Sequence, residues 1–495
     1  MQRGRFLYPV LAASAMVAGL AWFSGSVSID FMDGTEFVIC GRSLQLPHPP
    51  GYPLYIFFLR LFSLLTPCAR LDYACFRLFS SMVAGGTVAA AYAAARRFSC
   101  SRAGSLAGAV MLISSGPVLA QLNVVEVHGF AILLVLLAIS LGRSPSGPYF
   151  FSLSLFAGHP TSIFLLPPAL SGRFRERWLL PAALPVSLWL FAPLRSTFGG
   201  LCHYSSPADA DALWRYLTLY GSRLALPSLN GLQELVRATG IMTLAAMAGL
   251  AAFSGRWSWR LFLSFLGGIL FVSSYTIPDT SSILWIAVLP LGLWASMGLS
   301  RMFGGGRLLK AAAVALVFLS VLSGASMAWR RNDRVTDVIA GDYMRGAGPG
   351  AVLVTAGMST FHSAYLMEVA DRRPDIIPMD THRCFFRMAP PEELPEFMGG
   401  RAVYAIRGWE NDNLHLNGLL FTSGTRPVDW SDYDIFTYSG EVHDTFAGDE
   451  VAEIWARRGV QTLDEGERER CMETAVEWAR GRVAVERIRM LREGY

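Results

Sequence analysis

The chain has 495 residues, of which 53% are hydrophobic and only 16% are charged, and its formal net charge is +4. A soluble domain of this size carries more charge, so the composition excludes an ordinary soluble protein. The small net charge gives no support for a nucleic-acid-binding protein. Apolar runs of spanning length recur up to about residue 328 and then stop, which indicates an integral membrane protein with one soluble part at its end.

Residues 6–23 form the first apolar run, after a short basic start. A cleaved signal peptide is one interpretation of such a run. We favour an uncleaved first span, because the charged stretch after it needs an anchor and no clear Ala-x-Ala site follows. Arg3 and Arg5 then place the amino terminus in the cytoplasm, at the inner membrane of the cell. The stretch from Asp30 to Tyr55 follows on the outer side.

The stretch of residues 30–55, DFMDGTEFVICGRSLQLPHPPGYPLY, has the densest set of polar groups near a predicted span. It holds three carboxylates, which are costly in hydrocarbon, so we expect it to face water at the bilayer edge. If a helix begins here, Asp33 and Glu36 lie on one face of it. As the alternative without a function, Asp33 is simply the N-cap of that helix.

The same stretch resembles a known family. Residues 33–37 read DGTEF and residues 48–55 read HPPGYPLY. This is similar to the pattern of the membrane protein O-mannosyltransferases that modify plexin-type domains, and of their bacterial relatives. Those enzymes belong to the GT-C superfamily of polyprenyl-phosphate-sugar-dependent glycosyltransferases. The resemblance implies a multi-pass α-helical membrane protein of the GT-C type.

Further apolar runs follow in chain order. Residues 52–65 are short for a span and interrupted by Arg60, so we expect a helix in the outer interface. Residues 148–170 contain His159-Pro160, and two short helices that meet near His159 keep the following arginines inside. A polar outer loop is predicted from Arg195 to about residue 234. Other spans are predicted at residues 76–95, 103–122, 124–141, 178–194, 238–253, 261–277, 282–299 and 311–329, for a total of about eleven.

Residues 330–495 differ from the rest of the chain. Predicted strands at 351–355, 375–379 and 401–406 alternate with predicted helices at 361–370 and 391–398, which is typical of a small α/β domain with a parallel sheet. The glycine-rich residues 346–350 precede a strand, whereas a dinucleotide-binding loop would follow one, so we interpret them as a turn. Residues 467–492 predict a charged amphipathic helix. We therefore divide the chain into a transmembrane part, 1–329, and an extracytoplasmic part, 330–495.

The chain has seven cysteines and no CxxC pair. An odd and scattered set argues against a disulfide framework and against a zinc site.

Polar groups recur at the predicted outer ends of the spans, where ionisable residues are candidates for function. Ordinary alternatives exist: Glu126 ends a span in water, His159 satisfies a helix break, and Arg195 anchors the interface. Residues 126–128, 158–159, 192–196 and 353–380 are also similar to the family, with the family's tyrosine replaced by His128. The full set of candidates is Asp30, Asp33, Glu36, His48, Tyr52, Glu126, His159, Arg195 and Asp279.

Sugar transfer from a lipid phosphate to a hydroxyl needs a carboxylate that accepts the proton, a cation near the departing phosphate and a groove for the lipid tail. Asp33, Arg195 and the predicted interface helix could supply these three. The resemblance implies that Asp33 is the base and that the anomeric carbon inverts. Glu36 lies on the same predicted helix face, so we expect it to orient the acceptor or to support Asp33. Asp33 and Glu36 could also hold Mg²⁺ or Mn²⁺, but the sequence identifies no further ligand and predicts no certain metal.

The expected partners are a polyprenyl-phosphate sugar donor, a protein or glycan acceptor, and membrane lipid, without nucleic acid. A transporter or flippase of lipid-linked sugars is an alternative function, although inverted repeats would favour it and none is evident. A scaffold for envelope assembly, in which the soluble part binds partners, is a third.

Overall fold

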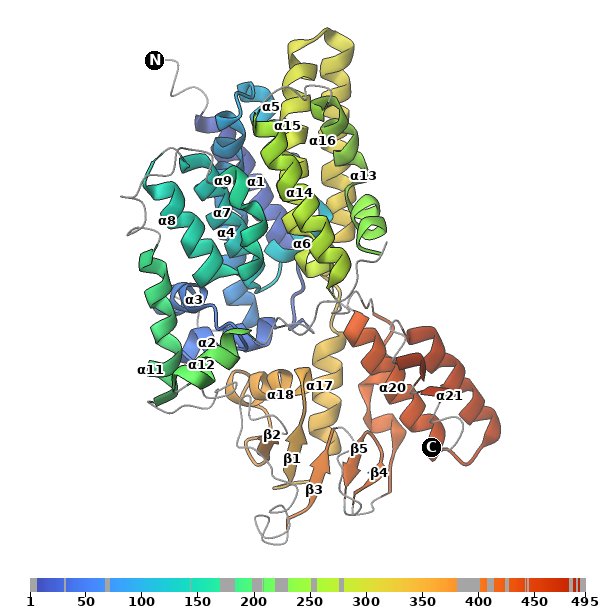
Figure 1. Cartoon of the computed structure of the whole chain (residues 1–495). Helices are drawn as coiled ribbons and strands as arrows, with labels where there is room; N and C mark the ends of the chain where they lie inside the picture. The colour runs from blue at the N-terminus through green and yellow to red at the C-terminus, as the bar shows by residue number, and fades with distance from the viewer. Residues whose placement is uncertain are drawn as a thin grey trace.

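The structure, a computed structural model, describes residues 7–30, 33–66, 72–142, 144–169, 183–197, 207, 209–218, 230–250, 256–275, 280–380, 401–406, 414–422, 427–440, 442, 445–479, 484–486 and 488–489. A bundle of helices occupies one end, and a β-sheet with its own helices occupies the other (Figure 1). We call residues 330–495 the C-terminal part.

Among the described residues, four helices are long and apolar enough to cross a membrane. They are α1 (Leu7–Ser24), α4 (Tyr73–Arg97), α15 (Trp285–Gly304) and α16 (Arg307–Met327). Shorter apolar helices or segments lie in α3 (Pro53–Leu65), α7 (Val127–Leu141), α13 (Asn230–Leu250) and α14 (Arg256–Ser274). The predicted number of spans therefore stays a prediction.

The apolar run of residues 103–122, which we predicted as one span, is bent in the structure. It forms α5 (Arg102–Ile113) and α6 (Gly116–Leu122), which are bent by 70° to one another. Ser114 and Ser115 lie at the break, and Pro117 stands in the first turn of α6, where its missing N–H leaves no bond unmade. The two serines and the proline end the first helix and start the second.

Small residues bring α5 close to α15, the most buried of the spanning helices. Gly104 and Gly108 face the backbone and side chains of Ser300 and Ser296 so closely that a Cβ atom at either glycine would collide with them. Contacts of this kind let helices associate in a membrane, where the hydrophobic effect contributes little.

Residues 146–169 are interrupted at His159, as predicted. The chain forms α8 (Ser146–Ser152) and the π-helical η2 (Leu153–Gly158), and after His159 the 3₁₀ segment η3 (Pro160–Leu165) and α9 (Leu166–Ala169). His159 itself is extended, with φ −135° and ψ 132°. Pro160 disfavours the helical conformation for the residue before it, which accounts for the break.

The predicted polar loop from Arg195 onward is shorter than expected. The helical segments η5 (Leu184–Leu190) and α11 (Phe191–Thr197) lead into it, α12 (Ala210–Thr218) lies inside it, and α13 already begins at Asn230. The first two turns of α13, NGLQELVR, mix polar residues with two leucines and a valine, so the continuous hydrophobic run starts later than the helix.

The C-terminal part contains a five-stranded sheet with the order β2-β1-β3-β5-β4. The strands β1 (Val352–Thr355), β2 (Ile377–Asp380) and β3 (Val403–Ala405) are parallel, as predicted. The strands β4 (His415–Asn417) and β5 (Leu420–Thr422) add an antiparallel hairpin, so the prediction of an all-parallel sheet was wrong. The helices of this part are α17 (Val335–Gly346), α18 (Met358–Glu368), α20 (Thr445–Gln461) and α21 (Glu465–Trp478). The predicted helix at 391–398 lies outside the described residues.

The two parts meet at the helix that carries the candidate site. The helix α18 packs against α2 (Gly34–Ser43) at the lower end of the bundle in Figure 1. The hydroxyls of Ser26 and Ser28 both donate to the Asp333 carbonyl, at 2.8 and 3.1 Å. The stretch before α2 and the start of the C-terminal part therefore lie on one side of the bundle.

One cysteine corrects the expectation from the count. Cys75, in the first turn of α4, is part of a disulfide, whereas Cys40, Cys100 and Cys471 are buried thiols. This bond was not predictable from the count, because a single disulfide among seven cysteines gives neither an even number of cysteines nor a recognisable spacing.

Candidate active site

The helix α2 places two carboxylates at its amino-terminal end. Asp33 occupies the N-cap position and Glu36 lies in the first turn. The expected cap bond is missing, since the Asp33 side chain accepts no hydrogen bond from the first turn. The side chain is 27% exposed and Glu36 is fully buried, so Asp33 is the carboxylate that a substrate can reach.

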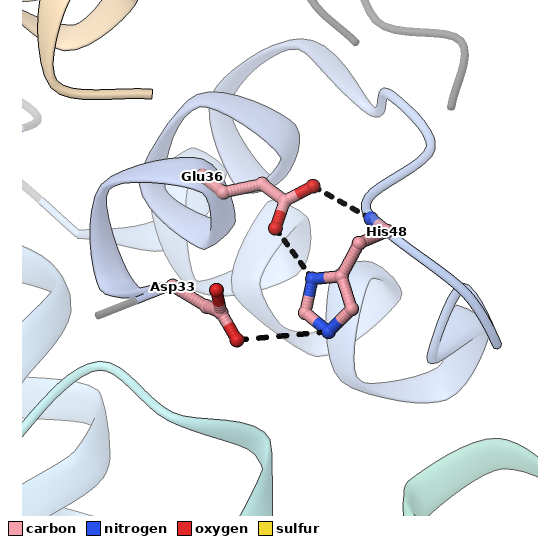
Figure 2. A group of neighbouring side chains, drawn as sticks. All are labelled: Asp33, Glu36 and His48. Atoms are coloured by element: carbon pink, nitrogen blue, oxygen red, sulfur yellow. Dashed lines mark hydrogen bonds and ion pairs between the residues drawn. The ribbon is translucent and has the colours of Figure 1, made fainter. Parts of the chain in front are cut away.

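His48 joins both carboxylates (Figure 2). Its Nδ1 lies 2.6 Å from Glu36 Oε2, and its backbone N–H donates to Glu36 Oε1 at 2.6 Å. Its Nε2 faces Asp33 Oδ2 at 3.6 Å, which is an ion-pair distance rather than a hydrogen bond. We call Asp33, Glu36 and His48 the polar triad.

The charges of the triad favour a protonated His48. Burial lowers the pKa of His48, but the carboxylates of Asp33 and Glu36, with a smaller contribution from Glu126, outweigh it and raise that pKa to about 10. Burial raises the pKa of Glu36, and the charge of His48 acts against this. At neutral pH His48 is therefore an imidazolium that lies beside the Asp33 and Glu36 side chains.

The return of the chain from α2 to His48 depends on one backbone conformation. Leu44 ends α2 in the left-handed region, with φ 54° and ψ 47°. The Arg195 side chain holds this turn from α11, because its Nε donates to the Leu44 carbonyl at 2.8 Å. The candidate Arg195 thus lies at the opposite end of α2 from Asp33.

A second group of side chains continues from the triad into the bundle. The Tyr52 hydroxyl lies 3.2 Å from His48 Nε2, and the Tyr52 ring stacks on His159 with a centroid distance of 5.9 Å. The ring centroids of His159 and His128 lie 4.4 Å apart. The Trp285 indole N–H donates to His128 Nδ1 at 3.2 Å. We call Tyr52, His128, His159 and Trp285 the aromatic cluster.

The other candidates lie near the triad or outside the described residues. Glu126 is buried and accepts a hydrogen bond from the Val127 N–H, so it caps α7 with its own side chain. Asp30 is buried and accepts from the Tyr73 hydroxyl. Asp279 lies outside the described residues, so its predicted role stays a prediction.

The structure adds residues that the sequence did not single out. Trp285 and Tyr73 were not predicted, and His128 was noted only beside Glu126. Trp285 and Tyr73 each stand at the first position of a long helix, which is no signal for a site in the sequence. Their positions depend on how α4, α7 and α15 pack.

The triad is also the place where a divalent cation fits. In the part of the chain that the structure describes, it is the only group of three such side chains, with ligand atoms within 4.8 Å of one another. His48 supplies the third ligand that the sequence left open. Carboxylate oxygens with one imidazole nitrogen suit Mn²⁺, and such a cation would replace the proton of His48.

Comparisons with known proteins agree with the motif and the fold. The family described as Protein O-mannosyl-transferase TMEM260 N-terminal domain matches residues 33–141. No curated protein matches the chain by sequence. Two solved structures of ArnT from Cupriavidus metallidurans are similar in fold. The first, bound to undecaprenyl phosphate, has a TM-score of 0.52 and 12% identity, and covers 79% of this chain and 92% of that chain. The second, in the apo state, has a TM-score of 0.52 and 10% identity, and covers 82% and 93%.

Proposed function

We propose that this chain, which resembles the GT-C O-mannosyltransferases in its amino-terminal motif and in its fold, is a membrane glycosyltransferase. It moves a mannose-like sugar from a polyprenyl-phosphate donor to a hydroxyl of a protein or glycan acceptor outside the cytoplasm. The observation that carries the proposal is the partly exposed Asp33 carboxylate beside His48 and the buried Glu36, within the residues that match the family.

Asp33 acts as the base of a single displacement. Its carboxylate accepts the proton of the acceptor hydroxyl while the acceptor oxygen attacks the anomeric carbon. The bond between that carbon and the phosphate oxygen breaks on the opposite face, so the configuration inverts and the polyprenyl phosphate leaves. His48 faces the Asp33 carboxylate at 3.6 Å and orients it, and Glu36 holds His48 in place.

The donor is inferred from three observations. The ArnT structure of similar fold is bound to undecaprenyl phosphate, a polyprenyl phosphate. The apolar helix α3 follows the triad directly and offers a surface for the lipid tail. Arg195 reaches α2 from α11, and its guanidinium is the proposed cation for the phosphate oxygens, although its Nε donates to the Leu44 carbonyl at the end of α2 away from Asp33.

The side of the membrane is inferred from the contact between the two parts. Because α18 packs on α2, the triad and the C-terminal part share one side. Cys75, close to this side, is part of a disulfide, and disulfides persist in oxidising compartments. Both support an extracytoplasmic site in a protein of the inner membrane whose amino terminus is cytoplasmic.

Sugar transfer by the purified protein in detergent tests the function. Synthetic polyprenyl-phosphate mannose with labelled sugar serves as the donor, and an envelope extract from cells that lack this protein serves as the acceptor. We expect label in the acceptor fraction. Movement of the donor across vesicles without transfer would support the flippase alternative, and neither activity would support the scaffold. A parallel assay with EDTA shows whether a divalent cation takes part.

Cysteine labelling tests the orientation. Ser43, exposed at the end of α2, and Ser359 on α18 are changed to cysteine one at a time in intact cells. We expect an impermeant reagent to label both. Labelling of one position without the other would contradict the shared outer side.

A further inference from the structure

The stretch before α2 is fixed by contacts that centre on Asp30. Asp30 is only 7% exposed and accepts a hydrogen bond from the Tyr73 hydroxyl, at the start of α4. The Val125 N–H donates to the same hydroxyl at 3.4 Å. One buried hydroxyl therefore connects the segment before Asp33 with the segment before Glu126.

The Asp30 carboxylate lies directly against the first residue of α2. A Cβ atom added to Gly34 would lie 2.8 and 3.0 Å from the two Asp30 oxygens and 2.9 Å from the Tyr73 ring. Real Cβ atoms essentially never come closer than 3.0 Å to other heavy atoms, so a side chain here would displace Asp30 or Tyr73. Gly34 is thus the residue that lets Asp30 approach.

The position of Asp30 explains the conformation of Asp33. A negative charge near the amino-terminal end of a helix is favourable, and Asp30 supplies one at α2. Asp33 occupies the N-cap position yet makes no cap bond with its side chain. Its carboxylate is turned toward His48 instead.

Tyr73 also connects this arrangement with the C-terminal part. Its backbone N–H is the first of α4, where an amide has no acceptor within the helix. The Tyr365 hydroxyl of α18 accepts this N–H at 3.0 Å, in a buried contact. The helix α18 packs on α2 as well, so the C-terminal part contacts both helices that the Asp30–Tyr73 hydrogen bond connects.

We propose that Asp30 is a positioning residue that fixes the start of α2 so that Asp33 faces His48, and that Tyr73 and Tyr365 extend this support into the C-terminal part. The proposal rests on the proposed function, because it concerns the base of that reaction. It gives Asp30 a role through Asp33 rather than through the substrate. It gives the C-terminal part a role in the rate of transfer.

Three tyrosine variants of the full-length protein test the proposal. Tyr73→Phe and Tyr365→Phe each remove one of the two hydroxyls. Tyr343→Phe is the matched control, because the Tyr343 hydroxyl is buried in the C-terminal part and donates to Glu450 there. The measurements are the transfer rate at saturating polyprenyl-phosphate mannose, the KM for this donor, and hydrogen–deuterium exchange of residues 34–43.

We expect Tyr73→Phe to lower the transfer rate about tenfold to a hundredfold, since a displaced catalytic group of this kind costs that much. The KM for the donor should stay unchanged and exchange in the first turn of α2 should rise. Tyr365→Phe should change the transfer rate and the exchange of α2 in the same directions but by less. Tyr343→Phe should change neither the rate nor the exchange. Gly34→Ala should reproduce Tyr73→Phe, because it displaces Asp30.

A wild-type rate in folded Tyr73→Phe, or unchanged exchange of α2, would overturn the proposal. Equal effects of Tyr343→Phe would also overturn it, because they would show a general loss of stability. Failure of the proposed function is a separate result: it appears as no transfer by the wild-type protein or as full turnover of Asp33→Asn. In that case the exchange of α2 still decides whether Asp30 and Tyr73 fix this helix.

Discussion

The polar triad and the aromatic cluster adjoin at Tyr52, yet they differ in exposure and in origin. The triad comes from one stretch, residues 33–48, and its Asp33 side chain is 27% exposed. The aromatic cluster comes from the segments before α3 and η3 and from the starts of α7 and α15, and all four residues are buried. From this difference we expect a division of roles, in which the triad presents charged side chains to a substrate and the buried aromatic cluster packs behind the triad.

The largest expected effect is the loss of the reactive charge of the triad. Asp33→Asn keeps the shape of the side chain but cannot accept the acceptor proton, so transfer should fall by about a hundredfold to ten-thousandfold. Donor binding and folding should stay nearly unchanged, because the proposed base acts on the acceptor. The measurement is turnover at saturating donor, with Asp30→Asn as the milder comparison. Near-normal turnover of Asp33→Asn would make Asp30 or Glu36 the next candidate.

A smaller loss is expected when the cation of the triad is removed. His48→Gln keeps a hydrogen-bonding side chain but takes away the positive charge between the carboxylates. Transfer should fall on the order of tenfold to a hundredfold, because Asp33 loses its orientation. Near-normal turnover of His48→Gln would show that His48 does not orient Asp33.

The stability of the protein should depend on pH through the same histidine. The pKa of His48 is about 10 in the fold and 6.5 in an unfolded chain, so the folded form binds this proton more tightly. Its contribution is complete below pH 6.5 and is lost as the pH rises toward 10. Thermal unfolding in detergent from pH 6 to 10 should show a steeper decline for the wild type than for His48→Gln. Parallel curves would show that His48 titrates alike in both states.

The smallest effect is expected in the aromatic cluster. Trp285→Phe removes the N–H that donates to His128 and should cost about 1 kcal/mol of unfolding free energy, with the transfer rate nearly unchanged. Trp294→Phe is the matched control, because Trp294 is also buried in α15 and its indole N–H has no hydrogen-bond partner among the described residues. A large loss of transfer in Trp285→Phe would show that the aromatic cluster takes part in the reaction.

The two regions also differ in how far the sequence predicts them. Asp33 and Glu36 are predictable, because their spacing places them on one helix face. The approach of His48 to Glu36 is not predictable, because it depends on the left-handed conformation of Leu44. Leucine rarely adopts this conformation, so the sequence does not signal it. Trp285 reaches His128 over 157 positions, a pairing between the starts of α7 and α15 that no local pattern in the sequence signals.

The fold shows the same limits. The strands β1 to β3 were predictable from their short apolar runs, and the break at His159 from the proline after it. The hairpin of β4 and β5 was missed because strands of three residues are too short to show alternation. The only local signal is Gly418, with φ +67°, in the turn between them.

The hydrogen bond from Ser26 to Asp333 spans 307 positions of the chain, and this separation has a consequence for biosynthesis. The segment before Asp33 leaves the ribosome early, but its partner is made only after α16. At about 5–20 residues per second, the delay is on the order of 15 to 60 s. During this time the first helix is already inserted, while the site beside it still lacks Asp333 and Tyr365. We expect chains truncated after residue 329 to reach the membrane without an ordered triad, so enzymatic competence comes late in translation.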